Sequence, residues 1–151
     1  MHAHSTPFQP KDPAFAARVR ASFARQPAMV LIGARLTRVE PGTTEIELPF
    51  RPQLTQQKGF VHGGILGMIA DSACGYAAYS LMPASSSLVT VEYKINILAP
   101  ARGDLVARGQ VIRPGRTLTV TRGDIFMADG THVASMQQTL LMLADTPDTQ
   151  E

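Results

Sequence analysis

The residue that stands out in this chain of 151 residues is Asp71, a carboxylate in the middle of the mostly apolar stretch 61–78. A helix that is apolar on every face is a buried helix, and an ionised carboxylate is costly to bury without partners. The same stretch opens with His62-Gly63-Gly64. The first turn of a helix there would leave backbone N–H groups without partners. A backbone anion site followed by a buried acid is what acyl-transfer chemistry requires.

The spacing of Gly63 and Asp71 sets a geometric constraint on this chemistry. Their separation along one helix corresponds to a rise of about 12 Å and a rotation of about 80°. An oxyanion donor and a base that act on one carbonyl must each lie about 3 Å from their target atoms. One chain therefore cannot supply both groups. The spacing predicts a symmetric dimer, in which Gly63 of one helix faces Asp71 of an antiparallel second helix.

Each of these residues also has a purely structural interpretation. Asp71 could bind a helix end or a basic residue across an interface, His62 could cap the helix, and the glycines could allow close packing. Cys74 lies one turn from Asp71 and could be a nucleophile. Burial among apolar groups leaves a thiol inert, however, and no histidine lies at a suitable spacing. We therefore expect Cys74 to pack rather than to react.

Composition narrows the classes of function. The single cysteine rules out a disulfide within the chain and favours a reducing compartment. The net charge of +2 and the scattered arginines differ from the clustered basic stripe of nucleic-acid-binding proteins. The four histidines lack a metal-site spacing. We expect no nucleic-acid partner and no metal.

The stretch 61–82 approaches the length of a membrane-spanning helix. A charge at its centre, Asp71, disfavours insertion, and small residues replace the usual leucine and isoleucine. The N-terminal residues lack the pattern of a signal peptide. We therefore expect a cytoplasmic protein with no membrane partner.

The elements that must position these residues follow from periodicity and turn signals. Asp12-Pro13 predicts the start of a short helix that ends at Pro27. Residues 30–39 and 44–48 predict a hairpin, with Pro41-Gly42 as its turn. After the long helix, strands are expected at 88–98, 104–113, 116–128 and 131–143. One buried helix covered by a curved, mostly antiparallel sheet is an α+β fold.

The segment Gln56-Gln57-Lys58-Gly59-Phe60-Val61-His62-Gly63-Gly64, with Asp71 nine positions after His62, resembles the hotdog-fold acyl-CoA thioesterases related to phenylacetyl-CoA thioesterase (PaaI-like). The later segment Arg113-Pro114-Gly115-Arg116-Thr117 and the order of elements agree with it. The resemblance covers about residues 28–143. It implies a five- or six-stranded sheet wrapped around the helix, and dimers that often pair into homotetramers.

This resemblance divides the chain into three expected parts. Residues 1–27 would form an N-terminal tail and a short helix, residues 28–145 the hotdog thioesterase domain, and residues 146–151 a disordered tail.

The resemblance also implies a role for each residue that matches the family pattern. Asp71 would activate water or attack the thioester carbonyl directly, and the Gly63 N–H would polarise that carbonyl. His62 would mainly order the helix start, and Thr90 would help to position the water. Gln56 would be a second positioning group, because many relatives carry here an asparagine that hydrogen-bonds near the thioester. The amide of Gln56 reaches one methylene further, which leaves both the substrate and this role open.

Arg113 and Arg116 flank a predicted turn between two strands. They could be solvated residues of a hairpin tip, or their guanidinium groups could bind the phosphates of coenzyme A, as the resemblance suggests. The expected reaction is hydrolysis of an acyl-CoA, which needs no cofactor because coenzyme A is part of the substrate. Two alternatives stay open: a hotdog acyl-CoA hydratase or dehydratase, and a non-catalytic acyl-CoA-binding module.

Overall fold

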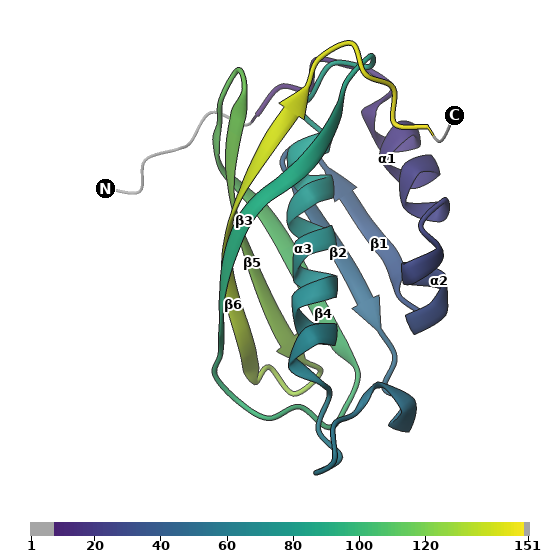
Figure 1. Ribbon diagram of the computed structural model, residues 1–151, viewed down its shortest axis with the longest axis vertical. Helices are drawn as coiled ribbons and strands as arrows, with labels where there is room; N and C mark the ends of the chain where they lie inside the picture. Colours follow the sequence, from purple (N-terminus) through teal and green to yellow (C-terminus); the bar gives the residue numbers. More distant parts are fainter. Residues whose placement is uncertain (1–7, 150–151) are drawn as a thin grey trace.

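The computed structural model describes residues 8–149, and its central element is a long helix that lies in the hollow of a curved sheet (Figure 1). The elements, in chain order, are α1 (Phe15–Ala24), α2 (Pro27–Ile32), β1 (Arg35–Glu40), β2 (Thr43–Leu48), a short 3-10 helix (Pro52–Leu54), α3 (Gly63–Tyr79), β3 (Ser87–Ile97), β4 (Leu105–Pro114), β5 (Leu118–Met127) and β6 (His132–Leu143).

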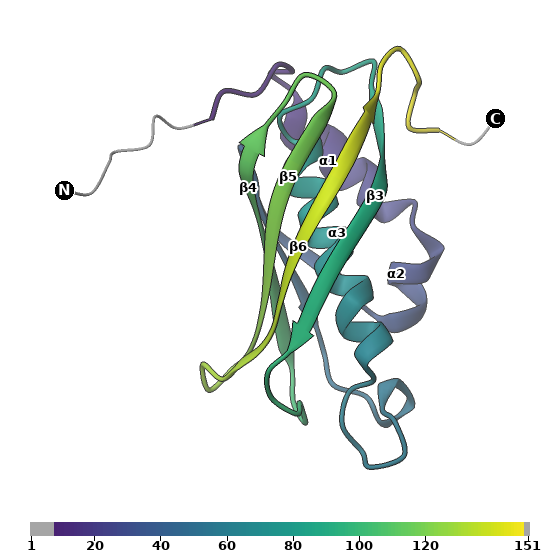
Figure 2. The ribbon, with the colours of Figure 1, turned by 60° about the vertical axis from the view of Figure 1, so that its left-hand side comes forward.

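The sheet contains six strands in the order β1-β2-β4-β5-β6-β3, and all neighbours are antiparallel. Figure 2 shows the sheet from the side, with α3 against its concave face and α1 beyond α3. The expected hotdog arrangement is confirmed. The four strands expected after the long helix are also confirmed, to within two residues at each end. No helix within residues 8–149 is long and apolar enough to cross a membrane.

Two glycines of the sheet let α3 lie directly on it. Gly109 of β4 pairs with Gly123 of β5 in the middle of the sheet. A Cβ atom on Gly109 would overlap the carbonyl oxygen of Ala73, and one on Gly123 would lie 2.8 Å from Sγ of Cys74. Since such contacts are too short for any side chain, both positions require glycine for this approach of helix and sheet.

The expectation that residues 30–39 form one strand is wrong in its first part. Residues Pro27–Ile32 form the short helix α2, and the strand begins only at Arg35. Pro27 occupies the first turn of α2, and Gly33 ends it in the left-handed conformation, with a φ of 75°. These two local signals outweigh the strand preference of the apolar run between them.

Helix α1 is fastened to the far end of α3 by Arg18. Its guanidinium donates to three carbonyl oxygens at the C-terminal end of α3 and just beyond it, at 2.7–3.1 Å, and pairs with Asp12 at 2.9 Å. Asp12 in turn accepts a hydrogen bond from the N–H of Ala14 at 2.9 Å, at the predicted start of α1. These contacts place α1 beside the C-terminal part of α3.

The C-terminal segment returns to α1. Asp148 accepts hydrogen bonds from the hydroxyl of Ser22 and, at 3.2 Å, from the guanidinium of Arg25. The rest of the expected tail, residues 150 and 151, and the first seven residues of the expected N-terminal tail lie outside the described residues.

Candidate active site

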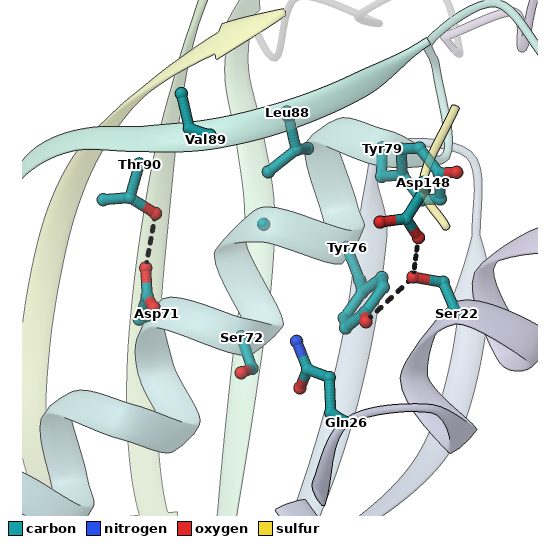
Figure 3. Close-up of a pocket in the computed structure, with 11 residues that line it drawn as sticks. Ser22, Gln26, Asp71, Ser72, Tyr76, Tyr79, Leu88, Val89, Thr90 and Asp148 are labelled. Carbon is teal, nitrogen blue, oxygen red and sulfur yellow. Dashed lines mark hydrogen bonds between the residues drawn. The ribbon is translucent and has the colours of Figure 1, made fainter. Parts of the chain in front are cut away.

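Asp71 lies midway along α3 and its carboxylate faces the strands β3 and β6. Its Oδ1 accepts a hydrogen bond from Oγ1 of Thr90 on β3, at 2.8 Å (Figure 3). The same Oδ1 accepts a second hydrogen bond from Nε2 of Gln138 on β6. Nε2 of Gln138 also lies 2.8 Å from Oγ1 of Thr90. We call Asp71, Thr90 and Gln138 the acid cluster.

Two donors of the acid cluster converge on the carboxylate of Asp71. Thr90 has one hydroxyl hydrogen and gives it to Asp71, so its oxygen is left to accept from the amide of Gln138. The amide has two hydrogens, one for each neighbour. With the amide reversed, its oxygen would face a carboxylate oxygen, so the hydrogen-bond pattern fixes its orientation. Asp71 therefore receives two donors on Oδ1.

A β-bulge in β3 makes the contact with Thr90 possible. Thr90 pairs with Leu140 of β6, whereas Ile97, seven residues later, pairs with Ala134, and the register shifts between Thr90 and Glu92. In a regular strand, residues an odd number apart face opposite sides. The bulge inserts one extra residue, so Thr90 and Ile97 both face α3.

Gln138 is the residue that the sequence analysis missed. Its side chain is completely buried, on the inner face of β6 between Met136 and Leu140. The signal in the sequence is a lone amide at alternate spacing among apolar residues that face the core. Sequence alone does not show which residue of another element it meets.

A cavity of about 220 Å³ lies beside the acid cluster, between α1, α3 and β3. Asp71 and Thr90 line one side of it, and Ser22 and Tyr76 line the other (Figure 3). The hydroxyl oxygens of Ser22 and Tyr76 lie 3.1 Å apart. Burial is the main reason that the pKa of Tyr76 rises to about 12, so its hydroxyl stays neutral at physiological pH.

His62, Gly63 and Gln56 meet at the start of α3, and we call them the glycine cluster. His62 is the N-cap, and its Nδ1 accepts a hydrogen bond from the N–H of Gly64 at 2.9 Å. The N–H of Gly63 belongs to the first turn, which has no intrahelical acceptor for it. Gln56 and Gly63 line a second cavity, of about 360 Å³.

The loop before α3 is held by contacts within itself and with Arg102. The side-chain oxygen of Gln56 accepts a hydrogen bond from the N–H of Lys58, and the N–H of Gln56 donates to the carbonyl of Phe60 at 2.8 Å. Arg102 stacks over the ring of Phe60 at 4.5 Å and donates to the carbonyl of Lys58 at 2.6 Å. The amide of Gln56 is thus partly used in shaping the loop.

The structure therefore groups the predicted site residues into two places. Thr90 lies with Asp71, and Gln56 lies with Gly63, but the two clusters line different cavities. This separation agrees with the geometry of one helix, on which Gly63 and Asp71 cannot meet.

Arg113 and Arg116 lie apart from both clusters. They belong to the β4–β5 hairpin, whose turn lies at the opposite end of the molecule from the start of α3 (Figures 1 and 2). Both side chains are exposed, and within residues 8–149 neither forms an ion pair.

Cys74 faces the sheet. Burial is the main reason that the pKa of its thiol rises to about 12, which keeps it protonated and unreactive. Within residues 8–149, no group of three or more His, Cys, Asp or Glu side chains is arranged to hold a metal ion.

The edge strand β3 exposes a row of apolar side chains. Val89, Val91, Tyr93 and Ile97 are each between 44% and 55% exposed. β3 pairs only with β6, so its other edge has free backbone groups in the described chain. A long apolar edge strand of this kind is a template for pairing with another strand.

Comparison with known proteins places these features in a wider group. A family model described as the thioesterase superfamily matches residues 58–134. A solved thioesterase family protein from Silicibacter pomeroyi is 46% identical in sequence, with a TM-score of 0.83, and the match covers 86% of this chain and 98% of that one. A predicted esterase of Halobacterium salinarum is 32% identical over 114 residues, which cover 68% of this chain and 76% of the esterase.

The fold is shared more widely than the sequence. The PaaI protein of the phenylacetic acid degradation operon of Escherichia coli is 21% identical, with a TM-score of 0.82, and the match covers 88% of this chain and 96% of that one. At this identity the likeness establishes a common fold. The family model ends at residue 134, before Gln138.

Proposed function

The chain belongs to the thioesterase superfamily and is a thioester hydrolase, and on that premise we propose that it hydrolyses an acyl-CoA to a free acid and coenzyme A. The observation that carries the proposal is the acid cluster, a carboxylate tied by two donors at one oxygen and placed beside a cavity. A carboxylate so held suits attack on, or activation of water at, a thioester carbonyl.

Asp71 acts as the base or as the nucleophile. As a base, it removes a proton from water while the water oxygen attacks the carbonyl carbon. The carbon–sulfur bond then breaks, and the leaving thiolate of coenzyme A takes up the proton. As a nucleophile, Asp71 displaces the thiolate and forms an acyl-enzyme anhydride; water then hydrolyses the anhydride, and a proton released from that water neutralises the thiolate. Both routes leave the developing oxyanion to be stabilised by a backbone N–H.

The oxyanion donor is Gly63 of a second copy. Ile97 lies against Gly63, since a Cβ atom there would be 3.0 Å from Cδ1 of Ile97, and Thr90 binds Asp71. If two β3 strands pair antiparallel about Lys94, and the extra residue of the bulge is counted, Thr90 of one copy lies opposite Ile97 of the other. Asp71 then approaches Gly63 of the second copy, and each dimer has two sites.

Exposed apolar groups on β3 support this pairing. Val89, Val91 and Tyr93 would be covered by the second copy, and the free backbone groups of the edge would be paired. The two helices would then run antiparallel beside each other. A further pairing of two dimers, as the resemblance implies, is part of the proposal.

The cavity beside Asp71 holds the acyl group. Its volume of about 220 Å³ is below the roughly 300–1,000 Å³ typical of sites that enclose a drug-sized ligand. Coenzyme A must therefore lie outside it. In the antiparallel dimer, the β4–β5 hairpin of one copy lies toward the start of α3 of the other. Arg113 and Arg116 could there pair with the phosphates of the nucleotide.

His62 has a role in structure rather than in proton transfer. Its Nδ1 is occupied by the N–H of Gly64, which favours hydrolysis over the hydratase alternative, in which a histidine works with an acid. A thiol-release assay distinguishes the two reactions, because hydration leaves the thioester intact. A binding module without activity would retain the thioester and release no thiol.

The test of the proposal is Asp71→Asn in a thiol-release assay across short, long and aromatic acyl-CoAs. Loss of the carboxylate is expected to lower kcat by about 10²- to 10⁴-fold. Asp129→Asn, in the exposed β5–β6 turn, is the matched control and is expected to keep the parental rate. Parental hydrolysis of every substrate by Asp71→Asn would contradict the assignment.

A further inference from the structure

We propose that Gln138 is a positioning residue that selects which oxygen of Asp71 reacts. This inference rests on the proposed role of Asp71 and adds a residue outside the range matched by the family model. The amide of Gln138 holds Oδ1 and orients the hydroxyl of Thr90, so that the other oxygen, Oδ2, is presented to the substrate.

Two hydrogen-bond donors converge on one carboxylate oxygen of Asp71. Thr90 and Gln138 come from neighbouring strands and both bind Oδ1 of Asp71. A single hydrogen bond would leave the carboxylate free to rotate about it. Two donors from different elements, which also bond to each other, fix the plane of the carboxylate. No hydrogen bond within residues 8–149 involves Oδ2.

Gln138 lies deeper in the fold than Thr90. Thr90 lies on an edge strand and is exposed in the described chain. Gln138 lies on β6, which has a strand on both sides, and is completely buried. The amide therefore anchors the acid cluster to the interior of the sheet. It also determines how Thr90 is used, because a hydroxyl that accepts from the amide gives its own hydrogen to Asp71.

The side-chain oxygen of Gln138 carries an energetic cost that packing does not offset. The side-chain oxygen of Gln138 is buried and has no hydrogen-bond partner among the described residues. A buried acceptor without a donor disfavours folding. An apolar side chain of similar shape would pack between Met136 and Leu140 without that cost. The unpaired oxygen is thus a cost to stability, and we relate the presence of the amide to the two hydrogen bonds that its nitrogen donates.

The test is Gln138→Met, which keeps the shape of the side chain and removes the donor. The expected result is a fall in kcat of about 10- to 100-fold, by analogy with the range found for hydrogen-bond partners of metal ligands, with KM within about twofold of parental. The midpoint of thermal unfolding is expected to stay equal or to rise. The matched control is Gln137→Met, because this neighbouring amide is exposed, and its kinetics are expected to stay parental.

A double-mutant cycle separates positioning from general support of the fold. Gln138→Met is expected to cost no further activity in an Asp71→Asn background, because its effect passes through the carboxylate. An equal loss in both backgrounds, or a parental kcat in Gln138→Met, would overturn the proposal. If Gln138→Met does not fold, Gln138→Asn, which shortens the reach of the amide, must show the same dependence on Asp71.

The outcomes also distinguish this inference from the proposed function. If Asp71→Asn is inactive and Gln138→Met is parental, the proposed function stands and the role of Gln138 is wrong. If Asp71→Asn is itself parental, both are wrong.

Discussion

The acid cluster and the glycine cluster are built in opposite ways. The acid cluster consists of side chains from three elements, α3, β3 and β6, that meet only when the sheet closes around the helix. The glycine cluster is local: a loop, a cap and the first backbone N–H of α3. The acid cluster depends on which side chains are present, and the glycine cluster depends on the path of the backbone. Side-chain substitutions that keep the backbone path and its N–H groups should therefore harm the acid cluster far more than the glycine cluster.

The strongest test of this difference is Gly63→Pro. Proline is well tolerated at the first position of a helix, and the preceding residue, His62, already has the extended conformation that proline requires, with φ −63° and ψ 138°. The variant should therefore fold and lack only the N–H. Removal of one oxyanion donor is expected to lower kcat by about 10²- to 10³-fold in the thiol-release assay.

Gly63→Ala is the control for this variant, because it keeps the N–H and adds only a methyl group near Ile97. It is expected to lose much less activity than the proline variant. Equal losses would show that space, rather than the N–H, matters at this position.

A second prediction concerns which chain supplies each of the two clusters that form one site. Asp71→Asn and Gly63→Pro, each nearly inactive alone, are mixed under conditions that exchange subunits. Each hybrid dimer then has one site with both groups intact, so roughly a quarter of the parental specific activity should return. The measurement is thiol release before and after mixing. Activity that stays at the level of the separate variants would mean that each site is formed within one chain.

A third prediction concerns the edge of the acid cluster. Thr90→Val keeps the shape of the side chain and removes the hydroxyl that binds Asp71. Since Gln138 still holds the carboxylate, the expected loss in kcat is about tenfold, the value of one hydrogen bond of about 1.4 kcal/mol. Thr90→Ser, which keeps the hydroxyl, should retain most of the activity. Parental kcat in Thr90→Val would leave Gln138 as the sole anchor of the carboxylate.

The smallest effect is expected at the cap of the glycine cluster. His62→Ala removes the acceptor for the N–H of Gly64 and should lower the free energy of unfolding by about 1 kcal/mol, as for other N-caps. His62→Asn, which supplies another capping side chain, should restore it. Chemical denaturation measures both values. A loss of kcat in His62→Asn as large as in Gly63→Pro would give the imidazole a role in the chemistry.

The same contrast explains which parts of the fold and of the site could be predicted from the sequence alone. The apolar run around Asp71 predicted α3, and alternation predicted β2 and the last four strands, because these signals are local. The pairing of Gln138 with Asp71 spans 67 residues, and it depends on a register that no local pattern specifies. The bulge beside Thr90 is equally invisible, although it decides which face that residue occupies.

Helix α2 was missed for a different reason. Val30 and Ile32 have strand propensities, and the helical turn is set by the residues on either side, Pro27 and Gly33. A six-residue helix is too short for periodicity to reveal. The role of Gly109 and Gly123 could not be predicted, because a glycine in a strand can be interpreted only when the element that packs on it is known.

The close contact of α3 with Gly109 and Gly123 also affects how rigid each part of the site is. The tightest contact between helix and sheet is at Ala73 and Cys74, and the hydroxyl of Thr44 donates to the carbonyl of Ala73 at 2.7 Å. Asp71 lies half a turn from this anchored point, whereas Gly63 lies at the end of the helix, where fraying begins. Opening of the first turn requires only local unfolding, and displacement of Asp71 requires the core to open. In the proposed dimer, the acid would thus be held by the interior of its own chain, and the oxyanion donor would be held in place by the second copy.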